Sequence, residues 1–129
     1  MIDTDILIYG IQERKKVTEN LKAHRNYPKA MSVITYGELI YGAKKSLFTE
    51  KNMANVRRLV EIFPILNITP AIMETFGELK ATLEKTGNPG DDMDLLIGST
   101  ALVHNLILVT NNTKHFQKIE GLELENWSV

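Results

Sequence analysis

Hydrophobic residues in this chain occur either in short unbroken runs or at helical spacing within longer polar stretches. The short runs predict strands near the N-terminus and at residues 30–34, 65–68, 106–110 and 122–127. The longer stretches predict helices up to about residue 24 and at 35–47, 50–63, 70–86 and 93–104. Short apolar strands that alternate with helices indicate one α/β domain over residues 1–129, with a mostly parallel sheet covered by helices on both faces.

Two of the predicted helices have clear start signals. Thr35 and Glu38 have the spacing of a capping box, and Thr69 with Pro70 has the pattern of a cap followed by a first-turn proline. The helix at 93–104 is mostly apolar, so we expect it to be buried on more than one side. The helix at 50–63 has an apolar face wide enough to favour a homodimer: Met53, Val56, Leu59, Val60 and Phe63.

The five aspartates of the chain are confined to positions 3 and 5 and to residues 91–94. Glutamates are instead spread along the chain beside lysine and arginine, as on solvated helix faces. In a parallel α/β fold, ligands bind beyond the carboxyl ends of the strands. Asp3 follows the first predicted strand, Glu38 follows the second, and Asp94 lies in the first turn of a late helix. We therefore expect these three carboxylates to meet in one pocket.

Such a group of carboxylates needs a proton or a cation, because charges about 4 to 6 Å apart repel by a few kcal/mol. The chain has no cysteine, and its three histidines do not have the spacing of metal ligands. Oxygen donors alone select a hard ion such as Mg²⁺ or Mn²⁺. An ion of this kind lowers the pKa of bound water and neutralises charge on a phosphodiester during hydrolysis.

Each acidic residue also has a structural interpretation. Glu38 suits the third position of a capping box, and Asp92 and Asp94 suit a helix N-terminus, where negative charge is favoured by about 0.3–1 kcal/mol. Asp5 suits a cap or a supporting group. Asp3 is the hardest to explain structurally, because it ends an apolar segment with no basic residue nearby in the sequence.

The other polar motifs have ordinary interpretations. Asn112 suits a turn after a strand, and His104, on an apolar helix, suits a core or interface position. His115 and Phe116 are expected to anchor the segment after the strand at 106–110. The basic runs suit solvated helix faces, and contact with phosphates is the alternative interpretation. These runs are Arg14-Lys15-Lys16, Lys44-Lys45 and Arg57-Arg58.

Composition sets limits on location and partners. A net charge of -1 gives no overall attraction for nucleic acid, so contact with RNA would depend on local basic patches. The absence of cysteine excludes a disulfide framework and a thiolate nucleophile. No basic stretch leads into an apolar segment, and no apolar run approaches the roughly 20 residues that span a bilayer. We expect a cytoplasmic protein that does not bind membranes.

Four segments together resemble a known family. IDTDILIYG, SVITYGELIYGAKKS and GNPGDDMDLLIGSTAL resemble the opening strand, the second strand with its acidic helix, and the third acidic segment of PIN-domain ribonucleases. LVTNNTKHFQKIEGLELENW is similar to the C-terminal quarter of VapC-type toxins from bacterial toxin-antitoxin pairs. The four segments occur in the family's order and cover nearly the whole chain, which makes them far more specific together than singly.

The resemblance implies a three-layer PIN-like fold with a five-stranded, mostly parallel sheet, and an endoribonuclease that depends on Mg²⁺ or Mn²⁺. The family's metal-binding and catalytic acids fall on Asp3, Glu38 and Asp94. A homodimer and a VapB-type antitoxin bound over the acidic groove are also implied. Orientation of water or phosphate, or support of the acids, is implied for Thr110, Asn112, Asp92 and Asp5.

Two features depart from the family pattern. Asn112 stands where many members have an acid, which does not favour a second metal site. Only Met1 and Ile2 precede Asp3, which is fewer residues than usual. We therefore expect the start of the chain to be truncated.

Two rival functions share acid-rich strand ends. A receiver-like signalling module would bind Mg²⁺ and accept phosphate on an aspartate in mid-chain, but residues 6 to 90 contain none. A DxD-type phosphatase is suggested by Asp3 and Asp5, yet Leu7 stands where that class has threonine or valine. The final acids also lack the basic residue that a phosphatase of this kind needs. Both rivals fit less well than the ribonuclease.

Overall fold

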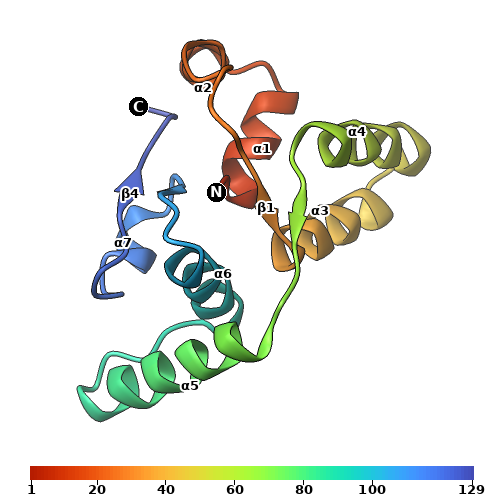
Figure 1. The fold of residues 1–129 in the computed structure, drawn as a ribbon. Coiled ribbons are helices and arrows are strands. Elements are labelled where there is room, and N and C mark those ends of the chain that lie inside the picture. Colours follow the sequence, from red (N-terminus) through yellow and green to blue (C-terminus); the bar gives the residue numbers. More distant parts are fainter.

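The computed structural model describes residues 1–129, which form seven helices and four short strands (Figure 1). The helices are α1 (Thr4–Ile11), α2 (Lys15–Ala23), α3 (Val33–Lys45), α4 (Thr49–Ile62), α5 (Pro70–Lys85), α6 (Asp92–Val103) and α7 (Thr113–Phe116). The strands are β1 (Met31–Ser32), β2 (Ile65–Leu66), β3 (Leu108–Val109) and β4 (Leu124–Glu125). The helices predicted at 50–63, 70–86 and 93–104 are confirmed, with ends that differ by about one residue.

The strands form two small parallel sheets, β1 with β2 and β3 with β4. Ile2 lies between them, since it forms a parallel bridge with Val109 and its N–H donates to the Ala30 carbonyl at 2.9 Å. The α/β class is confirmed, but the predicted five-stranded sheet is not. The pairing of Ile2 and of β1 is short because α1 and α3 begin directly after these residues, at Thr4 and Val33, where the chain leaves the extended conformation.

The N-terminal apolar segment is mostly helical, so the strand predicted there is present only at its beginning, where Ile2 forms its bridge. The Asp3 carboxylate accepts the Thr4 N–H at 2.8 Å and caps α1. Ile6 and Leu7 are buried on the inner face of this helix. A short apolar run suits a buried helix as well as a strand, and the packing of Ile6 and Leu7 determines the outcome.

The capping box predicted at Thr35 and Glu38 is wrong. Ser32 caps α3, and its side-chain oxygen accepts the Thr35 N–H at 3.0 Å. Thr35 lies inside the first turn and is completely buried. Glu38 is in the second turn, so capping does not explain its presence.

Two apolar clusters form the core. One joins α1, α3 and α4, and the other joins α5, α6, β3 and the residues around α7. In α6 every residue from Ile97 to Ala101 is buried, which confirms burial on more than one side. Gly98 allows this packing, because a Cβ there would lie 2.6 Å from Cδ1 of Ile119.

Two expectations about side chains differ from the structure. Val56 and Phe63 are buried in the first cluster, with Met53 and Leu59 packed against it, so the apolar face of α4 serves the core of a single chain. His104 is exposed and is not a core residue. None of the helices combines the length and apolar character needed to cross a bilayer.

Candidate active site

Asp3 is a buried carboxylate between the two small sheets. Asp3 is only 5 % exposed, and its backbone N–H donates to the Val109 carbonyl at 2.9 Å. Oδ1 accepts the Thr4 N–H and Oδ2 accepts the Thr110 hydroxyl, each at 2.8 Å. No lysine, arginine or histidine pairs with it, since the only ion pairs of the chain lie elsewhere. Asp3 is therefore a buried acid without a compensating cation.

The pKa of Asp3 is raised to about 7, mainly because burial removes water from its charged form. The negative charges of Asp5 and Glu38 raise this pKa further, while the hydrogen bonds from Thr110 and Thr4 lower it. Repulsion from two other acids shows that α1 and α3 bring three carboxylates into one neighbourhood.

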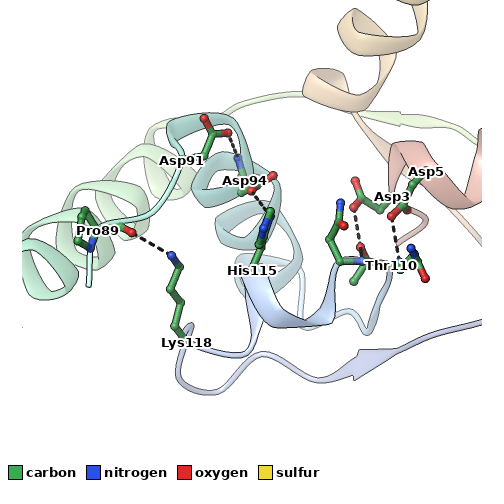
Figure 2. A network of polar contacts seen from close by, with 10 residues as sticks. Asp3, Asp5, Pro89, Asp91, Asp94, Thr110, His115 and Lys118 are labelled. Carbon is green, nitrogen blue, oxygen red and sulfur yellow. Dashed lines mark hydrogen bonds and ion pairs between the residues drawn. The ribbon is translucent and has the colours of Figure 1, made fainter. Parts of the chain in front are cut away.

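The segment after β3 supports the acids near α1. The Asn111 N–H donates to Asp5 Oδ2 at 3.0 Å, and the Asn112 N–H donates to the Thr110 hydroxyl at 3.0 Å. Burial raises the pKa of Asp5, while the hydrogen bond from Asn111 opposes this rise. Figure 2 shows Asp3, Asp5 and Thr110 in this network. The segment after β3 thus holds both N-terminal aspartates, Asp3 through the Thr110 hydroxyl and Asp5 through the Asn111 N–H.

Glu38 is exposed on α3 and is held by a threonine from α1. Its Oε1 lies 2.7 Å from the Thr4 hydroxyl, which is also 3.1 Å from the Thr35 hydroxyl. Thr4 therefore links the acid of α3 to the helix that Asp3 caps. The sequence signal for this link is slight, a threonine between two aspartates.

Asp94 is the third residue of α6, which Asp91 caps by accepting the Asp94 N–H at 3.2 Å. The Asp94 side chain is 27 % exposed, and its Oδ2 lies 3.4 Å from His115 Nδ1 of α7. Burial and then the charge of Asp91 raise the pKa of Asp94, whereas His115 lowers it. Asp92 points to another partner, because its carboxylate lies 3.1 Å from Lys80 Nζ.

The structure divides the predicted acids into two groups. Asp3, Asp5 and Glu38 surround the start of α1, and Asp94 contacts His115 in a separate pair, as Figure 2 shows for Asp3 and Asp94. No three acidic or histidine side chains lie close enough together to hold a metal ion. The two groups are nevertheless connected, because the short segment from Thr110 to His115 contacts both of them.

His115 is a site residue that the sequence did not indicate. The expectation that residues 115 and 116 anchor this segment is correct only for Phe116, which is completely buried. His115 is exposed and contacts Asp94 instead. No spacing rule pairs these residues, because they come from different helices 21 positions apart in the sequence.

The whole chain is similar to characterised nucleases. A PIN-domain family model matches residues 1–122. The chain is 35 % identical over 129 residues to a tRNA(fMet)-specific endonuclease VapC from Shigella flexneri, covering 99 % of this chain and 97 % of the relative. It is 37 % identical over 128 residues to a ribonuclease VapC2 from Haemophilus influenzae, covering 98 % and 96 %.

Solved structures agree with these relatives. The structure of VapBC2 from Rickettsia felis bound to a DNA fragment from its promoter matches with a TM-score of 0.91 at 35 % identity, covering 98 % of this chain and 97 % of that chain. VapBC-1 from nontypeable Haemophilus influenzae matches with a TM-score of 0.87 at 35 % identity, covering 100 % and 98 %.

Proposed function

This chain belongs to the PIN-domain family, among the VapC-type ribonucleases of toxin-antitoxin systems, and we propose that Asp3 and Glu38, joined by Asp94 when it leaves its contact with His115, bind the Mg²⁺ ion on which its RNA cleavage depends. Membership in this nuclease family argues against a receiver-like module and a DxD-type phosphatase. The observation that carries the proposal is the buried Asp3 carboxylate, which has neighbouring acids and no basic partner.

The donor atoms fit a hard divalent cation, because the proposed ligands are all carboxylates. PIN-domain nucleases generally use divalent metal ions. When bound, Mg²⁺ or Mn²⁺ would neutralise the carboxylates and the phosphate and lower the pKa of a water molecule. The charge of this cation would relieve the repulsion that Asp5 and Glu38 exert on Asp3.

The neighbouring residues have supporting roles in this proposal. The Thr110 hydroxyl orients Asp3 through Oδ2, and the Asn111 N–H holds Asp5 in place. The side chain of Asn112, whose N–H is fixed on Thr110, would orient water or phosphate by hydrogen bonds. Support from Asp92 stays a prediction from the sequence, since Asp92 pairs with Lys80 here.

We further propose that the protein forms a homodimer and binds a VapB-type antitoxin. Two of the solved structures that match this chain are VapBC structures from Rickettsia felis and Haemophilus influenzae, which supports the antitoxin part of the proposal. An antitoxin arginine would suit the acid group, because a guanidinium can make two hydrogen bonds to a carboxylate. Light scattering on the isolated protein tests the homodimer, and a strict monomer at tens of micromolar would contradict it.

Cleavage of RNA in vitro tests the main proposal. Purified protein would be incubated with total cellular RNA in EDTA, Mg²⁺ or Mn²⁺, and the new ends sequenced. We expect cuts only with a divalent ion and none with the Asp3→Asn variant. Initiator tRNA is the first specific substrate to test, because relatives from Shigella flexneri and Salmonella typhimurium are named for it. The absence of cleavage with either cation would refute the proposal.

A further inference from the structure

A basic pocket adjoins the acidic residues on the side of α2. It has a volume of about 400 Å³ and includes three consecutive basic residues among its lining, Arg14, Lys15 and Lys16. The rest of the lining comes from Tyr9, Val17, Asn111, Ser128 and Val129. None of the lining side chains is acidic, and the one negative group is the main-chain carboxylate of Val129, which leaves the three basic residues in excess. The three basic residues are exposed and form no ion pair, because the two ion pairs of the chain involve other residues. Their charges are therefore available to a ligand.

Tertiary structure forms this pocket. The C-terminal segment returns beside α2 (Figure 1), where the Asn20 side-chain amide donates to the Trp127 carbonyl at 3.1 Å. The Arg14 guanidinium lies over the Tyr9 ring, 3.8 Å from its centroid. The Arg14 Nε–H donates to Gln12 Oε1 at 3.0 Å, so the stacked guanidinium is restricted and its terminal N–H groups are the ones able to bind a phosphate. The run at 14–16, which by sequence alone suits a solvated helix face, thus forms one wall of a cavity.

Asn111 connects the pocket with the acidic residues. Its side chain is held at the pocket by the Ser128 hydroxyl, which lies 2.7 Å from Asn111 Oδ1, and by the Asn126 amide at 3.2 Å. Its N–H donates to Asp5 at 3.0 Å, two residues from Asp3. A strand of RNA whose phosphodiester lies at the acids would therefore place a neighbouring part of its backbone over the basic pocket.

We propose that this pocket binds an RNA backbone phosphate that flanks the bond being cleaved. The inference rests on the proposed function, which supplies the RNA strand. Three cations with no acidic side chain among them suit a phosphate, and lysine and arginine contacts of this kind supply affinity without reading sequence. The acidic residues would then act on one phosphodiester while the pocket positions the strand.

Binding and kinetics of a double variant test this role. Lys15→Ala/Lys16→Ala removes two charges from the pocket, and Lys44→Ala/Lys45→Ala removes the same charge from the last turn of α3 as a control. With a fluorescent single-stranded RNA and the Asp3→Asn background, which prevents cleavage, the pocket variant should bind about tenfold more weakly. The slope of log affinity against log salt concentration should become shallower by about 0.7, the value for one phosphate contact on a single strand. The control variant should match its parent.

In the cleaving protein, the pocket variant should raise KM by about tenfold and change kcat less than about twofold, because the pocket contributes binding in both ground and transition states. Unchanged RNA affinity and KM in the pocket variant would overturn the inference while leaving the proposed function intact. If RNA affinity is kept but antitoxin binding is lost, the pocket belongs to the antitoxin, and the inference is wrong. If the wild type cleaves no RNA, the proposed function fails, and the affinity measurement still decides whether the pocket binds RNA.

Discussion

Replacing Asp3 with asparagine separates the cost of burying a charge from the use of that charge in catalysis. Asparagine has almost the same shape, and its carbonyl oxygen can still accept the Thr4 N–H. Its amide can donate to the Thr110 hydroxyl, which has a second lone pair beside the bond from the Asn112 N–H. The variant should therefore fold and lack only the carboxylate.

The magnitude follows from the raised pKa of Asp3, which rises from 3.8 to about 7 on folding. Because the folded pKa is higher than the unfolded one, the stability that Asp3 contributes is fully present below the unfolded pKa and is lost as the pH rises through the folded pKa. At about 1.4 kcal/mol per tenfold change in the acidity constant, the full loss is about 4 kcal/mol. Of this loss, about 2.5 kcal/mol falls between about pH 5 and about pH 8.

Urea unfolding of the wild type and Asp3→Asn in EDTA, across this pH range, measures the effect. The free energy of unfolding of the variant, relative to the wild type, should rise by about 2.5 kcal/mol from the acidic to the basic end. At the basic end, Mg²⁺ should stabilise the wild type more than the variant, since a ligand stabilises only the state that binds it. A difference that stays constant within about 0.5 kcal/mol would refute the reasoning, because Asp3 would then not be a desolvated carboxylate.

Three further variants test separate features. Asp94→Asn should lose at least about a hundredfold in RNA cleavage, which is about 2.7 kcal/mol of transition-state stabilisation. It should melt in EDTA at or above the wild-type temperature, because burial and the charge of Asp91, which raise the Asp94 pKa, disfavour the charged carboxylate that the variant lacks. A destabilised but fully active variant would contradict this role. Asp91→Ala removes the cap of α6 and should cost about 1 kcal/mol in urea unfolding, and no loss would show that the 3.2 Å bond contributes nothing. Gly98→Ala places a Cβ 2.6 Å from Ile119, and overpacking of about 1 to 3 kcal/mol should exceed the gain of about 1 kcal/mol from replacing a helical glycine, so the variant should be less stable. A variant about 1 kcal/mol more stable than the wild type would show that the Ile119 side chain moves freely.

Several features of this protein are determined by residues within about one helical turn of each other, and the sequence alone reveals them. Thr69 caps α5 through the Ile72 N–H, and Pro70 occupies the first turn, as predicted. The apolar composition of residues 93–104 predicts the burial of α6. The PIN-domain ribonuclease family is indicated by the resemblance of four segments, which occur in the family's order along the chain. Local hydrogen bonds and periodicity explain the cap of α5 and the burial of α6, but the family follows from the resemblance.

Tertiary structure decided what local patterns left open. The segment after Asp3 is a helix because Ile6 and Leu7 pack into a core built from distant elements. Ser32 caps α3 although Thr35 and Glu38 have the spacing of a capping box. Ser32 and Thr35 lie three residues apart, and either residue type is a common helix cap. The burial of Thr35 distinguishes them, because it places Thr35 inside the first turn of α3 and leaves Ser32 as the cap.

The site depends on tertiary structure even more strongly. Thr110 and Asp3 are 107 positions apart, and the Asp94 contact with His115 joins α6 to α7. The basic pocket likewise requires the C-terminal segment to return to α2. The sequence determines which chemical groups are present, but the burial and pairing of those groups set the pKa of Asp3 and the shape of the pocket. Both depend on distances across the folded chain, which the spacing of residues along the sequence does not contain.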